Sequence, residues 1–146
     1  MINEIISGLS VALNDEFGDN YEICMEEMKQ DLKEPCFFIF CMQPKTDLFF
    51  GKKYFKKLPI CIQYFPSRMD KNAECYDVAE RMEQCLEYVR IGTDLMRGTE
   101  MSYEVVEGVL FFYIHYDYFV YRKDDTVAME SIETNVRPGG EKLDGR

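Results

Sequence analysis

Two segments of the chain repeat their hydrophobic residues with the spacing of an amphipathic helix. In residues 2–17 the apolar positions recur every three or four residues, and Gly18 follows the last of them. In residues 70–89 the same spacing continues for about five turns, with charged and polar residues on the opposite side. Asp70 or Asn72 can cap the start of this second segment. We expect two helices, each with one face against the protein core.

Between these helices the pattern changes to that of β-strands. Residues 21–26 alternate between more and less polar side chains, as in a strand with one wetter face. The run CFFIFCMQ at residues 36–43 is almost entirely apolar, which predicts a central strand buried on both faces or in an oligomer. Residues 58–64 alternate cleanly and predict a further strand with a clear core face.

The part of the chain after the second helix is also predicted to be β-structure. A short strand is expected near residues 94–97, and a hairpin of residues 101–106 and 109–122 is joined by the two-residue turn Glu107–Gly108. The resulting order is α-β-β-β-α-β-β-β. It predicts an α+β fold in a single domain, with a mostly antiparallel sheet and two helices packed on it. The domain is expected to cover residues 1–125.

Residues 47–65, DLFFGKKYFKKLPICIQYF, do not fit a single strand register. The second half places Leu58 on the core face, and the same alternation carried backward would bury Lys56. We therefore expect a β-bulge at Lys56–Lys57, which would leave both lysines in water and turn Phe55 toward the core.

The same stretch is predicted to be a hairpin at the edge of the sheet. Gly51 marks its turn, and Pro59 lacks the N–H donor that a central strand needs. Lysines on an edge strand hinder unwanted pairing with other chains, and they are also candidates for a contact with another protein. The candidate interface residues are Lys45, Lys52, Lys53, Lys56 and Lys57.

Composition and charge set this lysine-rich hairpin apart from the rest of the chain. At 146 residues the chain can bury one sizeable core, and its net charge of -10 argues against the whole molecule binding polyanions. Residues 45–72 nevertheless carry seven basic and two acidic residues. Lysines between aromatic rings can form a stacking platform for nucleic acid, but the acidic flanks would repel it. A contact with an acidic protein, including another copy of this chain, fits the pattern better.

Features of export and membrane insertion are not seen in the sequence. Residues 1–10 lack the pattern of a secretory signal, and the longest apolar run, residues 109–121, is too short to cross a bilayer as a helix. We therefore expect no membrane contact, and six reduced, buried cysteines without disulfides. Residues 126–146 are polar and predicted to form a flexible C-terminal tail.

Candidates for catalysis and metal binding are few. The single histidine, His115, shares a strand face with Asp117, and such a pair can act as a general base. A polar position on a strand or at a subunit interface is the favoured explanation of the pair. The cysteines show no C-x-x-C pair, and Gly139–Gly140 lacks the strand and helix of a phosphate loop. We expect no enzymatic activity, no metal and no cofactor.

Four segments of the chain resemble a known family. They are EPCFFIFCMQP, FFGKKYFKKLPICIQYFPS, AECYDVAERMEQCLEYV and YEVVEGVLFFYIHYDYFVY. Together they resemble small prophage proteins described as phage tail terminators or minor tail proteins. The resemblance covers nearly all of residues 1–125 and is one of overall pattern rather than of a catalytic motif.

This resemblance implies a structural role in the virion tail. Six copies would form a ring that caps the finished tail tube, stops its polymerisation and contacts the head-tail connector protein. DNA would later pass through the ring without specific binding, and an acidic channel would let it slide. The protein would be made in the bacterial host cytoplasm. Two alternatives remain: a head-tail connector or neck component, and a cytosolic protein that binds a small ligand in an aromatic pocket.

Overall fold

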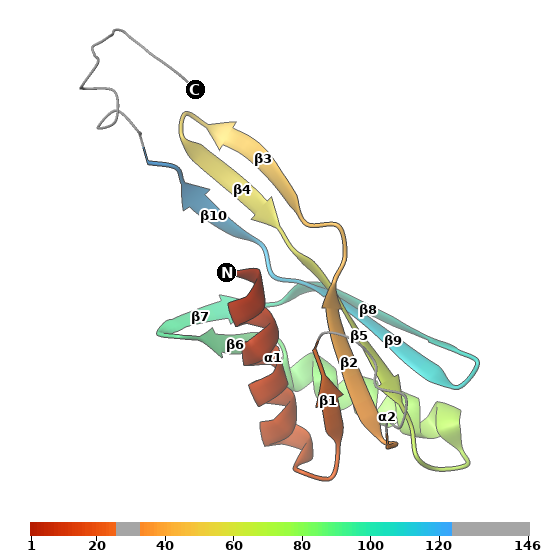
Figure 1. Ribbon diagram of the computed structural model, residues 1–146. Helices are drawn as coiled ribbons and strands as arrows, with labels where there is room; N and C mark the ends of the chain where they lie inside the picture. The colour runs from red at the N-terminus through yellow and green to blue at the C-terminus, as the bar shows by residue number, and fades with distance from the viewer. Residues whose placement is uncertain (26–32, 124–146) are drawn as a thin grey trace, which may run out of the picture.

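The computed structural model describes residues 1–25 and 33–123, and its centre is a five-stranded sheet (Figure 1). The strand order is β1-β2-β5-β9-β8. In that order the strands are Glu22–Cys24, Cys36–Cys41, Pro59–Phe65, Val109–His115 and Thr99–Val106. β1 runs parallel to β2, and the other neighbouring pairs are antiparallel. The sheet and the elements packed on it are called the body below.

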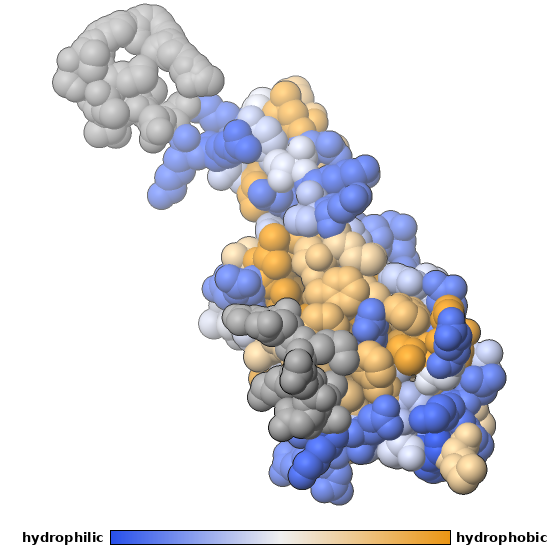
Figure 2. All heavy atoms as spheres, turned by 45° about the vertical axis from the view of Figure 1, so that its right-hand side comes forward, coloured by the Kyte–Doolittle hydropathy of each residue, from blue (hydrophilic) through white to orange (hydrophobic). Residues whose placement is uncertain are grey.

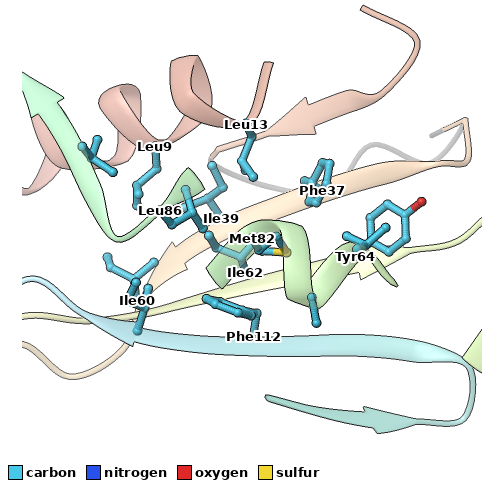
Figure 3. Packing of buried hydrophobic residues seen from close by; sticks show 14 of the residues in the cluster. Leu9, Leu13, Phe37, Ile39, Ile60, Ile62, Tyr64, Met82, Leu86 and Phe112 are labelled. Atoms are coloured by element: carbon cyan, nitrogen blue, oxygen red, sulfur yellow. The ribbon is translucent and has the colours of Figure 1, made fainter. Parts of the chain in front are cut away.

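One face of this sheet is covered by the helices α1 (Ile2–Phe17) and α2 (Lys71–Cys85). The buried residues of α1 recur every fourth position, so a single stripe of the helix enters the core. Figure 3 shows side chains of both helices meeting those of β2, β5 and β9. A hairpin of β6 (Tyr88–Ile91) and β7 (Asp94–Arg97) packs beside α1. The main hydrophobic cluster therefore lies on one side of the sheet.

A second, three-stranded sheet projects beyond the end of the body (Figure 1). Its strands are β3 (Lys45–Phe50), β4 (Lys53–Lys57) and β10 (Tyr118–Tyr121), with β4 in the middle. All neighbouring pairs are antiparallel. We call this sheet the arm. β4 leads directly into β5 and β9 leads into β10, so the arm is an outward continuation of two adjacent strands of the body.

The junction between arm and body is fixed by buried groups. The Leu58 side chain is buried, and its N–H donates to Asp117 Oδ1 at 2.9 Å. The Tyr116 N–H donates to the Leu58 carbonyl at 3.0 Å. The buried Tyr116 hydroxyl donates to the Leu86 carbonyl at 2.6 Å, at the end of α2. These bonds hold the two connecting strands at a set place on the body.

The α+β class, the two helices and the mostly antiparallel sheet agree with the sequence prediction. The second helix ends at Cys85 rather than at residue 89, because residues 88–91 pair as β6 with β7. The strand expected over residues 109–122 is interrupted between His115 and Tyr118. Phe37 and Ile39 of β2 are buried on the helix side, whereas Phe38 and Phe40 on its other side are partly exposed. Residues 124–146, which include the predicted tail, lie outside the described residues.

The predicted edge position and the predicted bulge were both wrong. β5 is the central strand of the large sheet, and Pro59 is tolerated there because it is the first residue of the strand. β4 pairs on both sides without a register shift at Lys56–Lys57. Because the chain leaves the core at Leu58, the alternation continues unbroken and Lys56 reaches the arm surface. Phe55 accordingly lies on the arm and not in the body core.

Candidate assembly surfaces

One face of the arm is aromatic, and a bulge in β3 adds to it. The register between β3 and β4 shifts between Leu48 and Phe50, which inserts Phe49 as an extra residue. Phe49 and Phe55 both contact Phe119 on β10, with ring centroids 5.0 and 4.8 Å away. Phe50, paired with Lys53 on the same side, is 79% exposed. We call this side, with Phe49, Phe50, Phe55, Phe119 and Tyr121, the aromatic face of the arm.

All five lysines predicted from the sequence lie on the arm or in its turn. Lys53 belongs to the aromatic face, and its ammonium lies 4.4 Å from the Phe119 ring centroid. Lys45 and Lys57 lie opposite each other in the register of β3 and β4, at the base of the arm. The Lys57 ammonium lies 4.0 Å from Asp47 Oδ2. Lys56 points to the other side of the arm, beside Tyr118.

Lys52 lies in the turn at the tip of the arm, and its carbonyl accepts a bond from the Arg122 N–H at 3.0 Å. The β3–β4 hairpin, residues 45–57, thus carries five lysines and one aspartate. The net charge of the hairpin is therefore positive, opposite in sign to that of the whole chain, and it is concentrated on the arm.

The arm leaves apolar surface uncovered. Its strands pair with one another, and its tip residues Leu48 and Phe49 are 64% and 60% exposed. A small three-stranded sheet needs a packed hydrophobic face to be stable by itself, and large apolar side chains exposed together mark interaction sites. The arm therefore has the character of a contact surface.

The second candidate surface is the side of the five-stranded sheet that faces away from the helices. Register pairs place Phe38, Phe40, Phe65, Phe111 and Tyr113 on this side, and each is half-buried. We call it the open face. Figure 2 shows hydrophobic residues gathered over the middle of the body, and a second group at the end of the arm. Among the described residues, the helices pack on the opposite side only.

Acidic and thiol groups lie among the aromatic rings of the open face. Glu22 on β1 and Glu104 on β8 are exposed at its two edges, and the Tyr113 hydroxyl donates to Glu104 at 3.1 Å. Burial, and to a smaller degree Glu104, raises the pKa of Cys61 to about 11. Burial also raises the pKa of Cys36 to about 12, aided by Cys24, Glu34 and Glu22. Both thiols stay protonated at neutral pH, which makes them poor nucleophiles.

The histidine and aspartate singled out in the sequence lie at the junction of arm and body. His115 Nδ1 is 3.6 Å from Asp117 Oδ1 and 3.9 Å from Glu100 Oε2. Glu100 was not anticipated, since it reaches this position through a bulge in β8 and a positive φ of 52°. Within the described residues His115 Nδ1 has no hydrogen-bond partner. The Asp117 oxygen already accepts from Leu58 N–H, so this carboxylate has a structural use independent of catalysis.

Sequence reasoning found the lysines of the hairpin and the aromatic residues between them, but it missed the open face and the contribution of β10 to the arm. The unbroken apolar run of β2 predicted burial on both faces or in an oligomer, and it did not identify the partly exposed open face. The aromatic face of the arm depends on β10, which lies about 60 residues after β4 in the chain. No helix in the described ranges is long and apolar enough to span a membrane.

Comparison with known proteins identifies the family. A search of the curated proteins found no match. Residues 4–128 match the family described as phage tail terminator protein. The matched range includes α1 from its third residue onward, α2, the whole five-stranded sheet and the arm. The chain therefore belongs to the phage tail terminator protein family, whose members are structural components of the phage tail.

Proposed function

We propose that six copies of this protein form a ring that caps the tail tube, ends tube polymerisation and forms the joint to the head connector. Membership of the tail terminator family carries this proposal. The proposal is supported by two different uncovered surfaces, the arm and the open face. A contact between different surfaces of identical chains generates a closed ring or a filament. A cap requires the closed form.

The role we assign is structural and not enzymatic. The thiols of the open face are protonated at neutral pH, and the carboxylate of the His115–Asp117 pair is engaged by Leu58 N–H. Assembly surfaces, in contrast, are extensive. The partners of the protein are then further copies of itself, the tail tube protein and the connector protein, and its synthesis takes place in the host cytoplasm.

The net charge of -10 suits a channel through which DNA slides without specific binding. Acidic side chains facing the channel would repel phosphates and prevent the DNA from adhering. A structure of the assembled ring tests this point through the charge of its bore. An uncharged or basic bore would contradict it.

Deletion of the gene in an inducible prophage tests the capping function. Electron microscopy of the induced lysate should show overlong tubes without heads, because nothing stops the addition of tube subunits. Complementation with the wild-type gene should restore normal particles. Tails of normal length that lack heads would instead assign the protein to the connector side of the joint, and normal phage would refute both roles.

The lysines of the arm are expected to contact either the neighbouring subunit or the tail tube. Replacing Lys52, Lys53, Lys56 and Lys57 by Glu should abolish capping while the monomer remains folded, since these side chains lie on a projection outside the core. A control that reverses three exposed basic residues of the body, Lys33, Lys71 and Arg90, should assemble normally. Unchanged assembly of the arm variant would reject the contact.

A further inference from the structure

We propose that the arm of one copy lies on the open face of the next copy around the ring, with its aromatic face against the aromatic side chains of β2, β5 and β9. This inference rests on the proposed ring and specifies its interface. It names two surfaces of the same chain, one for each side of every contact.

Hydrophobic complementarity is the first argument. The aromatic face of the arm presents Phe49 and Phe50 at 60% and 79% exposure, and the open face presents a flat layer of half-buried rings that includes Phe38 and Phe111. Each surface lacks a cover of its own among the described residues. Contact between them would remove both from water, which is the main favourable contribution to association.

Charge complementarity is the second argument, and it decides between possible partners. The aromatic face carries Lys53 and Lys57, whereas the edges of the open face carry Glu22 and Glu104. A symmetric contact between two arms would bring lysines together, and a contact between two open faces would bring glutamates together. Only the arm-to-face contact pairs opposite charges, which favours the encounter and fixes its register.

The junction explains why the contact joins two copies. The Asp117 side chain and the Tyr116 N–H both bind the Leu58 backbone, and these bonds hold the arm outward from the end of the body (Figure 1). To reach the open face of its own chain, the arm would have to break them and fold back along β5. The next copy can receive the arm without any such change. A contact between two different surfaces propagates around a ring in one direction.

Paired charge reversals provide the test, in the prophage that carries the full-length gene. Lys53→Glu with Lys57→Glu should reduce the phage titre to that of the deletion, and Glu22→Lys with Glu104→Lys should do the same. All four changes in one chain should restore the titre to within about tenfold of the wild type, because the reversed charges again attract. Glu80→Lys with Asp94→Lys, two exposed acidic positions on the helix side, is the matched control and should leave the titre unchanged.

Crosslinking then locates the contact. With p-benzoylphenylalanine in place of Phe50, irradiated tails should contain covalent multimers of this chain, joined from residue 50 to residues of β2, β5 or β9. The inference is overturned if residue 50 crosslinks only to the tail tube or connector protein. It is also overturned if the variant with all four charge reversals does not regain titre. Tube length in the deletion strain is the separate test of capping. The proposed capping function and the proposed arm-to-face contact can therefore fail independently.

Discussion

Replacement of Glu74 by Gln should destabilise the monomer because this buried carboxylate collects four hydrogen bonds. Glu74 Oε2 accepts from the Tyr64 hydroxyl at 2.5 Å and from the Ser67 N–H at 3.1 Å. Its Oε1 accepts from the Arg68 N–H at 2.9 Å and from Arg68 Nε at 3.3 Å. The Glu74 side chain is only 8% exposed. The four bonds fasten the connection between β5 and α2 to the first turn of the helix.

The expected magnitude follows from what glutamine can still accept. A glutamine side chain at this position has one oxygen and one amide NH2, so the donors at one of the two carboxylate oxygens lose their acceptor. If the oxygen stays toward Tyr64, the Arg68 backbone N–H is left without a partner, while the exposed Arg68 side chain can turn to water. A hydrogen bond to a charged acceptor is worth about 1.5–3 kcal/mol. The free energy of unfolding should fall by about 2–3 kcal/mol at pH 7.

The pH dependence supplies a second measurement of the same effect. Burial by itself would raise the pKa of Glu74, but the bonds from Tyr64, Ser67 and Arg68 outweigh it and lower the pKa. The unfolded chain therefore takes up this proton first, at about pH 4.3, and the stabilisation is lost as pH falls through the lower pKa of the folded protein. Above the unfolded pKa the difference between wild type and Glu74→Gln should be constant. Below it, the difference should shrink.

Urea unfolding followed by far-UV circular dichroism measures both quantities, since the chain has no tryptophan for fluorescence. Urea titrations at about pH 7 and about pH 3.5 lie on either side of the pKa of about 4.3 that glutamate has in the unfolded chain. The other carboxylates titrate alike in both proteins, so their effects cancel in the difference. A change smaller than about 0.5 kcal/mol at pH 7, or a difference that grows on acidification, would refute the reasoning.

Two further substitutions separate the folding of the body from the surfaces used in assembly. Tyr116→Phe removes the donor to the buried Leu86 carbonyl and should lower the free energy of unfolding by about 1–3 kcal/mol in the same urea assay; a neutral result would mean that this bond does not hold the junction. Phe50→Ser changes a side chain that is 79% exposed and should alter the stability of the monomer by less than about 0.5 kcal/mol, while weakening assembly in tails. A large loss of monomer stability would show that Phe50 packs within its own chain.

Local sequence signals identified the helices and most strands because those signals act within the element itself. In α1 the apolar residues recur at helical spacing, and the same residues, from Ile5 to Phe17, are buried. The hairpin of β8 and β9 follows in the same way from its two-residue turn. The five lysines of the candidate surface were visible as a local reversal of charge in an acidic chain.

Which strands pair, and therefore which side chains meet, depends on contacts between distant parts of the chain. The alternation through residues 54–64 is unbroken in the structure. In the sequence it places Lys56 on the core side, which fits a bulge as well as a strand that leaves the body at Leu58, so the segment alone does not show that β4 joins β3 and β10. Periodicity assigns a residue to a face, but which partner covers that face depends on segments far away in the chain. The apolar run of β2 likewise could not reveal that helices cover only one of its sides. Local patterns in the chain are enough to place most elements and the charge of the hairpin, whereas long-range strand pairing creates the arm, the open face and their separation in space.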